Sequence, residues 1–425
     1  MAMKDEVIIV GAGAAGCSIA YHLARRGITS QLIDREGIAS RASGKAWAVW
    51  DYPPATVLTS DINLVVQSIL ADSDINLTVL SNLTDAELQS EIAQRRQYAQ
   101  RMVDLHWIGY NRLPEAIREL EERGGIDVEY RELPFIKIAL SEEVEEAYKE
   151  EFSAVRSAGY YEGDWLEPDE LQAIFPNINP KIKGGICLPG FKVEPYKYTL
   201  CLAQAAEKMG CTIRSGEVVG FGSQGSRVTS VVLASGTEIK ATEVVLAMGP
   251  WIGQATSWLG KELPVELHRV QCIRVELTHP FPPYGIWTTE GAIIPESGNQ
   301  ILLDGFKGWP DLVTKFDSSL TEESKLSAIE MGTHLFPEIE NGAIVEHRGD
   351  LDCWTPVLRV RPVLGRHPEW DNVYLASRFG NCGMMVSLSA GELMAELIVR
   401  GGQAPYRVEK LLETLSPVEL KESKS

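Results

Sequence analysis

Residues 7–34 read VIIVGAGAAGCSIAYHLARRGITSQLID, and this stretch decides the fold. An apolar run at 7–10 leads into a GxGxxG motif, a helical pattern follows at 17–26, and a second apolar run ends at Asp34. A strand, a glycine turn, a helix and a second strand in this order form a βαβ unit, whose two strands lie parallel in one sheet. The stretch therefore predicts an α/β protein with a Rossmann-like domain.

The glycine motif predicts a turn that binds phosphate. Gly11 permits a tight turn off the strand, Gly13 lets the backbone approach a pyrophosphate, and Gly16 lets the helix pack closely on the sheet. The helix start adds unpaired N–H groups and a partial positive charge. Asp34 follows about 20 residues later, where a carboxylate can accept hydrogen bonds from a ribose. The motif thus predicts a dinucleotide site without choosing between NAD and FAD. The neighbouring residues assigned to this site are Ala14, Ala15 and Arg35.

Length and charge indicate an acidic globular protein with room for two domains. The chain has 425 residues, and its formal net charge of −19 repels nucleic acid and anionic membrane surfaces. No apolar run reaches the roughly 18 residues that span a bilayer. The apolar segment near the amino end is the glycine motif itself, which argues against a signal peptide. We expect a small-molecule substrate, no nucleic-acid partner and no membrane span.

Cysteine and histidine usage bears on compartment and metal content. The chain has seven cysteines, an odd number, and none of them is in a CxxC pair. Such usage favours reduced thiols in a cytoplasmic protein. The seven histidines form no HExxH or similar cluster, so no metal site is expected.

Outside the first βαβ unit, the pattern of elements alternates between helix and strand. The loop at 39–46 is rich in small and hydroxyl side chains, which suits contact with a ligand, although a surface loop can have the same composition. Segment 51–83 shows no clear pattern. A capping box at 84–87 predicts a helical region to about residue 123, interrupted near Gly109 and Pro114. Further strands are expected at 132–140, 211–214, 227–234, 238–240, 243–249 and 373–376, and further helices at 142–158, 196–209, 322–335 and 387–400.

Four segments, in order along the chain, resemble the motifs of one enzyme family. The first is 7–34, the second is Val193-Glu-Pro195 before a helix, and the third is Met248-Gly-Pro-Trp251 after an apolar strand. The fourth runs from 361 to 398 and contains Gly380-Asn-Cys-Gly383. Together they resemble the D-amino-acid oxidase superfamily of FAD-dependent oxidoreductases, which includes glycine oxidase, sarcosine oxidase and D-amino-acid dehydrogenase.

The resemblance implies two domains. A discontinuous FAD-binding domain would comprise residues 1–125, 193–264 and 351–425. A substrate domain of the α+β type would comprise residues 126–192 and 265–350, built on a mixed, largely antiparallel sheet.

The resemblance also implies where FAD binds. Val218 would contact the adenine through its backbone, and Ala247 and Gly249 would lie beside the nucleotide. The carboxy-terminal motif would lie beneath the flavin ring, where a following helix can favour negative charge. The other predicted FAD contacts are Ala42, Ser43, Gly44, Trp251, Gly380, Asn381, Gly383 and Met384.

By the same resemblance, the reaction oxidises a C–H bond next to nitrogen by hydride transfer to flavin N5, which gives an imine that hydrolyses. The cofactor supplies this chemistry, while the protein supplies orientation and electrostatics. Arginine usually holds the substrate carboxylate in this family, because its planar fork matches that group. Arg348 and Arg359 are the favoured clamps, ahead of Arg361 and Arg378.

The chain departs from the family pattern near the flavin. Trp47 precedes Ala48, which stands where the family has glycine, so the pocket wall is expected to be bulkier. Cys382 stands where sarcosine-oxidase-like members have histidine, and we include Trp47 and Cys382 among the catalytic candidates. Lys45 stands where some relatives attach flavin through histidine. Cys353 lies near the attachment cysteine of others, but we expect it to be a buried free thiol.

Three alternatives remain open from the sequence. The first is FAD-dependent oxidation of a hydroxy acid or glycerol phosphate, which needs a general base such as His268, His347 or His367. The second is a catalytically weak FAD-binding subunit of a heteromeric dehydrogenase. The third, an NAD-dependent dehydrogenase, does not account for the Met248-Gly-Pro-Trp251 segment. The sequence does not determine the substrate, the electron acceptor or the oligomeric state.

Overall fold

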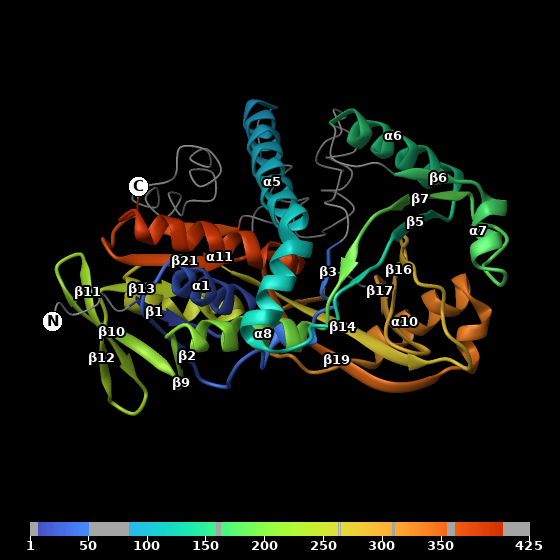
Figure 1. The fold of residues 1–425 in the computed structure, drawn as a ribbon. Helices are drawn as coiled ribbons and strands as arrows, with labels where there is room; N and C mark the ends of the chain where they lie inside the picture. Colours follow the sequence, from blue (N-terminus) through green and yellow to red (C-terminus); the bar gives the residue numbers. More distant parts are fainter. Residues whose placement is uncertain are drawn as a thin grey trace.

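A computed structural model of the protein describes residues 7–50, 85–158, 163–261, 263, 265–307, 311–354 and 362–402 (Figure 1). For residues 85–103, 154, 155 and 158 it describes the backbone alone. The unassigned segment 51–83 lies outside the described residues.

A six-stranded sheet forms around the amino-terminal βαβ unit, as predicted. The strand order is β20-β21-β13-β1-β2-β9, and the strands are parallel except for the β20–β21 pair. Helix α1 (Ala14–Arg25) crosses over between β1 and β2. Apolar runs suit this sheet because both of its faces are buried. The strands are β1 (Val7–Val10), β2 (Ser30–Asp34), β9 (Thr212–Ser215), β13 (Glu243–Leu246), β20 (Val363–Arg366) and β21 (Val373–Ser377).

Helices cover one face of this sheet and a small antiparallel sheet covers the other (Figure 1). The helices are α1, α5 (Asp85–Gly124), α8 (Pro195–Lys208) and α11 (Gly383–Val399). The small sheet consists of β10 (Val218–Gln224), β11 (Arg227–Leu233) and β12 (Glu238–Lys240). The last two strands, both expected from the sequence, pair antiparallel.

Helix α5 differs from the sequence prediction, because it runs through Gly109 and Pro114 without interruption. A proline inside a helix costs about 3 kcal/mol or more. Here, Leu113 and Ile117 are buried in the core on either side of it, and this packing offsets the cost. A Cβ atom on Gly109 would lie 3.1 Å from the carbonyl oxygen of Met385, so the glycine allows α5 to approach α11 closely. Tertiary packing therefore overrides the local signal.

A nine-stranded mixed sheet forms the second part of the molecule. Its order is β18-β14-β17-β16-β15-β5-β7-β6, with β19 paired to β14, and only the β15–β5 pairing is parallel. Helix α10 (Glu322–Leu335), at its predicted position, packs on one face. The strands are β5 (Phe135–Ala139), β6 (Asp164–Leu166), β7 (Gly184–Leu188), β14 (Glu266–Glu276), β15 (Gly285–Trp287), β16 (Gly291–Pro295), β17 (Gln300–Gly305), β18 (Asp311–Val313) and β19 (Ala343–Trp354).

Short elements complete the described fold. A three-stranded sheet, β3-β8-β4, brings residues on either side of the long α5 helix together. The remaining elements are α2 (Ala42–Lys45), β3 (Val49–Trp50), β4 (Arg131–Glu132), α6 (Glu142–Ala158), α7 (Pro168–Ile174), β8 (Phe191–Lys192), η2 (Gly249–Ala255), α9 (Thr256–Leu259), η3 (Pro337–Asn341) and η4 (Gly380–Cys382).

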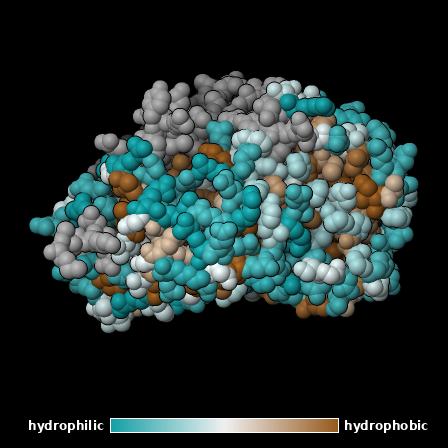
Figure 2. Space-filling model, in the orientation of Figure 1, coloured by the Kyte–Doolittle hydropathy of each residue, from teal (hydrophilic) through white to brown (hydrophobic). Residues whose placement is uncertain are grey.

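The carboxy-terminal helix is the most apolar helix of the described chain. Residues Gly380–Val399 are long and apolar enough to cross a membrane by length and composition alone, contrary to our reading of the sequence. However, 61% of the segment's most apolar 18-residue window is buried inside the protein, where α11 packs against α1 and α5. Its apolar character is therefore that of a core helix. The face shown in Figure 2 is mainly hydrophilic, with scattered hydrophobic residues.

The buried His22 on α1 predicts a pH-dependent stability. Burial lowers the pKa of His22 from 6.5 to about 3, assisted by Arg25 and Arg26. Protonation therefore favours the unfolded chain, and the contribution of His22 is complete above pH 6.5 and lost as pH falls towards 3. Each pKa unit corresponds to about 1.4 kcal/mol.

We expect the unfolding free energy of His22→Met to fall less steeply than that of wild type as pH is lowered from 6.5 towards 3. Urea denaturation at a series of pH values measures this dependence. His279→Gln, at an exposed position, serves as the control and should retain the wild-type slope. Equal slopes in wild type and His22→Met would contradict the assignment.

Candidate active site

One cavity of about 530 Å³ joins the two predicted ends of the site. Gly11 and Gly13 of the amino-terminal turn line it, and so do Gly380 and Met384 of the carboxy-terminal turn. Strands β14, β17 and β19 of the nine-stranded sheet contribute the opposite wall. Its size is within the range of about 300–1,000 Å³ that ligand pockets usually have.

The glycine turn has the geometry expected of a phosphate cradle. Gly11 has a φ of +106°, and a Cβ atom there would lie 2.3 Å from the carbonyl oxygen of Ala247. A Cβ atom on Gly16 would lie 1.9 Å from the carbonyl oxygen of Gly11, so this glycine serves packing. Beside Gly13, by contrast, the nearest atom is Ser43 Oγ at 3.0 Å. The space over Gly13, at the N-terminus of α1, therefore remains open to an anion.

Asp34 has more backbone partners than the sequence suggested. Its Oδ2 accepts a hydrogen bond from Ala12 N at 2.8 Å, and its Oδ1 accepts from Glu36 N and Gly37 N at 2.8 and 2.9 Å. The carboxylate thus holds the turn after β2 in place. Each carboxylate oxygen has about two acceptor sites, so Oδ2 retains capacity for a hydroxyl donor on the cavity side.

Two arginines and a tryptophan close the cavity near Asp34. The guanidinium groups of Arg35 and Arg41 lie 4.9 and 5.1 Å from the ring centroid of Trp251. Glu36 holds both arginines, with Arg41 Nε at 2.6 Å and Arg35 Nε at 3.1 Å. The hydrogen bond from Arg41 is the main cause that lowers the pKa of Glu36. The result is a flat surface of guanidinium groups stacked on an indole ring, with paired charges, which suits the adenosine end of a dinucleotide.

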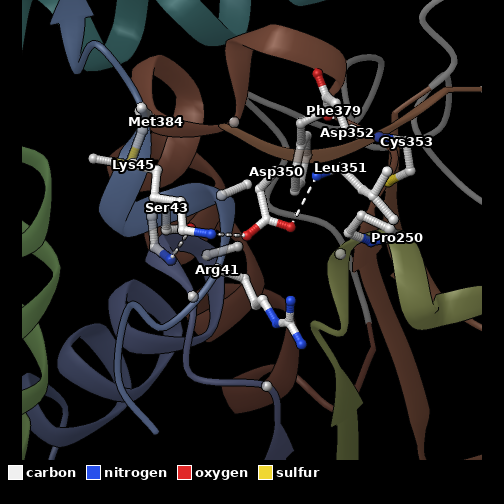
Figure 3. A pocket seen from close by; sticks show the side chains of 18 of the residues that line it. Arg41, Ser43, Lys45, Pro250, Asp350, Leu351, Asp352, Cys353, Phe379 and Met384 are labelled. Atoms are coloured by element: carbon white, nitrogen blue, oxygen red, sulfur yellow. Dashed lines mark hydrogen bonds and ion pairs between the residues drawn. The ribbon is translucent and has the colours of Figure 1, made fainter. Parts of the chain in front are cut away.

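Lys45 and Asp350 tie helix α2 to strand β19 in the middle of the cavity (Figure 3). Lys45 Nζ lies 2.7 Å from Asp350 Oδ2 and donates to the carbonyl oxygen of Gly349 at 3.1 Å. Asp350 Oδ1 accepts from Leu351 N at 2.9 Å. Lys45, which the resemblance places at a flavin-attachment position, is held here by an ion pair.

The carboxy-terminal turn presents a helix N-terminus to the cavity. Helix α11 begins at Gly383, four residues before the predicted start at Ser387, and Gly383 and Met384 both line the cavity. The turn before it uses positive φ angles, +59° at Arg378 and +55° at Gly380. The backbone N–H groups and partial positive charge of α11 therefore face the site.

A family comparison decides what the cavity holds. The model of the FAD dependent oxidoreductase (DAO) family matches residues 6–397. The protein belongs to the DAO family of FAD-dependent oxidoreductases. Its cofactor is FAD, which resolves the choice that the glycine motif left open. The open space over Gly13 and the continuous cavity from Asp34 to Met384 fit an extended dinucleotide.

Characterised relatives and a solved structure agree with this membership. Glycine oxidase of Geobacillus kaustophilus is 26% identical over 404 residues, which cover 94% of each chain. D-amino acid dehydrogenase of Xanthobacter autotrophicus is 26% identical and covers 94% of this chain and 96% of its own. The crystal structure of the Geobacillus glycine oxidase superposes with a TM-score of 0.75 and 23% identity, covering 93% and 95% of the two chains. The last comparison shows a shared fold.

This DAO-family enzyme brings most of its predicted site residues to one cavity. Gly16 and Gly44 do not line it: a Cβ atom on Gly44 would lie 2.1 Å from the carbonyl oxygen of Ala39, so both glycines serve backbone packing. Arg359 and Arg361 lie outside the described residues. The predicted residues that line the cavity are Gly11, Gly13, Ala14, Ala15, Asp34, Arg35, Ala42, Ser43, Trp47, Val218, Ala247, Gly249, Trp251, Arg348, Arg378, Gly380, Asn381, Gly383 and Met384.

Two cysteines considered from the sequence have different surroundings. Cys382 is half-buried against the core and does not line the cavity, and its thiol donates to Asn381 Oδ1 at 3.4 Å. Its catalytic role remains a prediction. Cys353 does line the cavity, but burial raises the pKa of its thiol to about 12. Because the thiolate is the nucleophile, this neutral thiol is poorly suited to attaching a flavin.

The substrate side of the cavity is aromatic and contains buried charges. Trp47 and Trp287 lie with ring centroids 5.3 Å apart, and Phe306 lies 6.0 Å from Trp287. Arg348, which is 9% exposed, donates from Nη2 to the carbonyl oxygen of Ala46 at 3.2 Å. Its Nε has no hydrogen-bond partner among the described residues. Its Nη1 lies 3.8 Å from Glu346 Oε2. A buried guanidinium that lines the cavity is suited to binding a carboxylate.

Sequence reasoning missed several lining residues, namely Glu36, Arg41, Cys272, Trp287, Asp304, Phe306 and Asp350. A signal was available for Asp304, since it directly follows the apolar run Ile301-Leu-Leu303, and a carboxylate at such a position is unusual. The others depend on strand pairing and loop placement, which a single sequence does not reveal.

Proposed function

We propose that the protein oxidises the C–N bond of a carboxylate-bearing amine or amino acid to an imine, which then hydrolyses. FAD, when bound, supplies the two-electron acceptor for this chemistry. The proposal rests mainly on one observation: the buried guanidinium of Arg348 lines the aromatic, substrate side of the cavity. The names of the relatives, glycine oxidase and D-amino acid dehydrogenase, support the same substrate class.

The protein's own residues would orient the substrate and exclude water. Arg348 would hold the carboxylate, and Trp47, Trp287 and Phe306 would shield the reacting carbon. The N-terminus of α11 would favour negative charge at the other side of the cavity. We assign the FAD contacts to the predicted residues that line the cavity, and we propose no covalent link to the flavin.

The hydroxy-acid alternative is less well supported. Removing an alcohol proton calls for a general base, but none of the described residues that line the cavity is a histidine. His268, His347 and His367 are therefore not placed to act there. The other alternative, a catalytically weak FAD-binding subunit, does not explain why Arg348 lines the cavity.

We also propose the domain division expected from the sequence, with residues 1–125, 193–264 and 351–425 forming the FAD domain. The described strands of the six-stranded sheet all fall within these segments, whereas those of the nine-stranded sheet fall within 126–192 and 265–350, apart from the end of β19 at Trp354. A cytoplasmic location is proposed because all seven cysteines are free.

An anaerobic substrate screen tests the proposed function. Amino acids, N-methylated amines and hydroxy acids are mixed separately with the yellow protein, and flavin absorbance is followed. We expect bleaching by one or more carboxylate-bearing amines and none by hydroxy acids. Bleaching by hydroxy acids alone, or by no compound, would contradict the proposal. Readmitting air then shows whether oxygen reoxidises the cofactor.

A further inference from the structure

We propose that Asp304 binds the protonated nitrogen of the substrate and takes its proton before oxidation. This inference rests on the proposed function. Asp304 lies on β17, is 8% exposed and lines the cavity. It would add an amine-recognition group to the carboxylate clamp at Arg348.

Strand pairing puts Asp304 on the same face of the sheet as Arg348. Arg348 on β19 is opposite Cys272 on β14. The β14–β17 pairing includes Ile273 with Leu303, which leaves Cys272 and Asp304 as the next opposed residues. Neighbouring strands lie about 4.8 Å apart, so the Arg348 and Asp304 backbones are roughly 10 Å apart. One arginine side chain, one small amino acid and one aspartate side chain span this distance.

Within the described parts of the chain, the Asp304 carboxyl has no hydrogen-bond or ion-pair partner, and burial alone perturbs its pKa. Other aspartates of the cavity do have partners: Asp350 pairs with Lys45, and Asp352 Oδ1 accepts from Cys353 N at 2.8 Å. Asp304 lines the cavity, and neither of its carboxylate oxygens is sealed from it, so both oxygens are open to a ligand. A ligand cation would pair with this carboxylate.

The surroundings of Asp304 favour a cation over a neutral or anionic group. Asp304 shares its cavity with the rings of Trp47, Trp287 and Phe306, and aromatic faces attract ammonium groups. The nearest titratable group on β14 is the Cys272 thiol, and β16 and β15 contribute Ala292 and Trp287 to the same row. On the other side of Cys272, the same row of side chains continues with Arg348 on β19. Its guanidinium is the only charged group on that side of Cys272 in the described part of the row.

The chemical step is a proton transfer alone. An amine gives up hydride only after its nitrogen has lost the proton that blocks the lone pair. The N–H bond of the ammonium breaks, its electron pair stays on nitrogen, and the proton joins a carboxylate oxygen of Asp304. Burial raises the pKa of Asp304 well above its usual value, so an ionised carboxylate there is a stronger base than an exposed one. An adjacent substrate ammonium favours this ionised form, because an opposite charge stabilises it.

The test compares Asp304→Asn with wild type on the best amine substrate of the anaerobic screen. We expect kcat/KM to fall about 10- to 100-fold at neutral pH, the range for losing a charged hydrogen bond. The loss should shrink as pH rises, because the variant can use only substrate that is already neutral, whose fraction grows about tenfold per pH unit below the amine pKa. Propionate, which has the carboxylate but no amine, should perturb the flavin spectrum with unchanged affinity.

Three outcomes would overturn the proposal: an unchanged kcat/KM, a loss that is constant with pH, or equally weakened propionate binding. The variant should fold, because it removes a buried carboxylate whose ionisation opposes folding above its unfolded pKa, and thermal unfolding checks this. Glu276→Gln, at the exposed end of β14, is the matched control and should behave as wild type. If wild type itself oxidises no amine, the proposed function fails, which is a different result.

Discussion

Replacing Gly13 by alanine is expected to give a folded protein that no longer retains FAD. The added Cβ atom would meet only Ser43, whose Oγ lies 3.0 Å away and accepts from Ala14 N at 3.0 Å. It would, however, occupy the open space over the N-terminus of α1, where a diphosphate receives backbone hydrogen bonds. Losing one or two such charge-assisted bonds, at about 1.5–3 kcal/mol each, weakens binding by at least roughly 10- to 100-fold.

Fluorescence titration of the deflavinated protein with FAD measures this effect, and circular dichroism reports the fold. Gly220→Ala is the matched control, since a Cβ atom there meets nothing within 4 Å and Gly220 does not line the cavity. Gly11→Ala should behave differently and destabilise the protein, because its Cβ atom would clash with the backbone of Ala247. Normal FAD affinity in Gly13→Ala would be incompatible with a phosphate site at this turn.

Replacing Arg348 by alanine is expected to raise KM for the amine substrate by about two to three orders of magnitude. Two charged hydrogen bonds to a carboxylate contribute about 3–6 kcal/mol in gross terms, and every 1.4 kcal/mol is tenfold. The contact of Arg348 Nη2 with the carbonyl oxygen of Ala46 would also be lost. Since the carboxylate is bound in the ground state and the transition state alike, kcat should fall less than KM rises.

Two variants show whether this effect belongs to the guanidinium in the cavity. Arg348→Lys retains the charge but loses the planar guanidinium that can donate two parallel hydrogen bonds to a carboxylate, so we expect an intermediate KM. Arg274→Lys is the matched control: Arg274 pairs with Glu346 at 3.1 Å, as Arg348 does at 3.8 Å, but it does not line the cavity. Steady-state kinetics that show equal losses for Arg274→Lys and Arg348→Lys would remove Arg348 from the site.

The sequence predicts the amino-terminal half of the site well because its signals are local. Gly11, Gly13 and Gly16 owe their identity to contacts within one βαβ unit and with the neighbouring strand. The fold class and the family follow from the same unit together with three later motifs, and both are confirmed. Helices α6 and α10 are also found where the sequence predicts them.

The substrate side was less predictable because it depends on contacts between distant segments. Asp304, Cys272 and Arg348 share one face only through the register of three strands. Helix α5 continues through Pro114 because of packing in the core that its own sequence does not reveal. Helix α11 starts at Gly383 rather than Ser387, since the glycine-rich turn already has helical geometry there.

A crystal structure of the yellow, FAD-loaded protein tests the central claim most directly. We predict one extended FAD per chain, with its diphosphate against Gly13 and its ring beside Gly380–Met384. A nucleotide bound elsewhere, or one that reaches only the amino-terminal or the carboxy-terminal turn, would contradict the account.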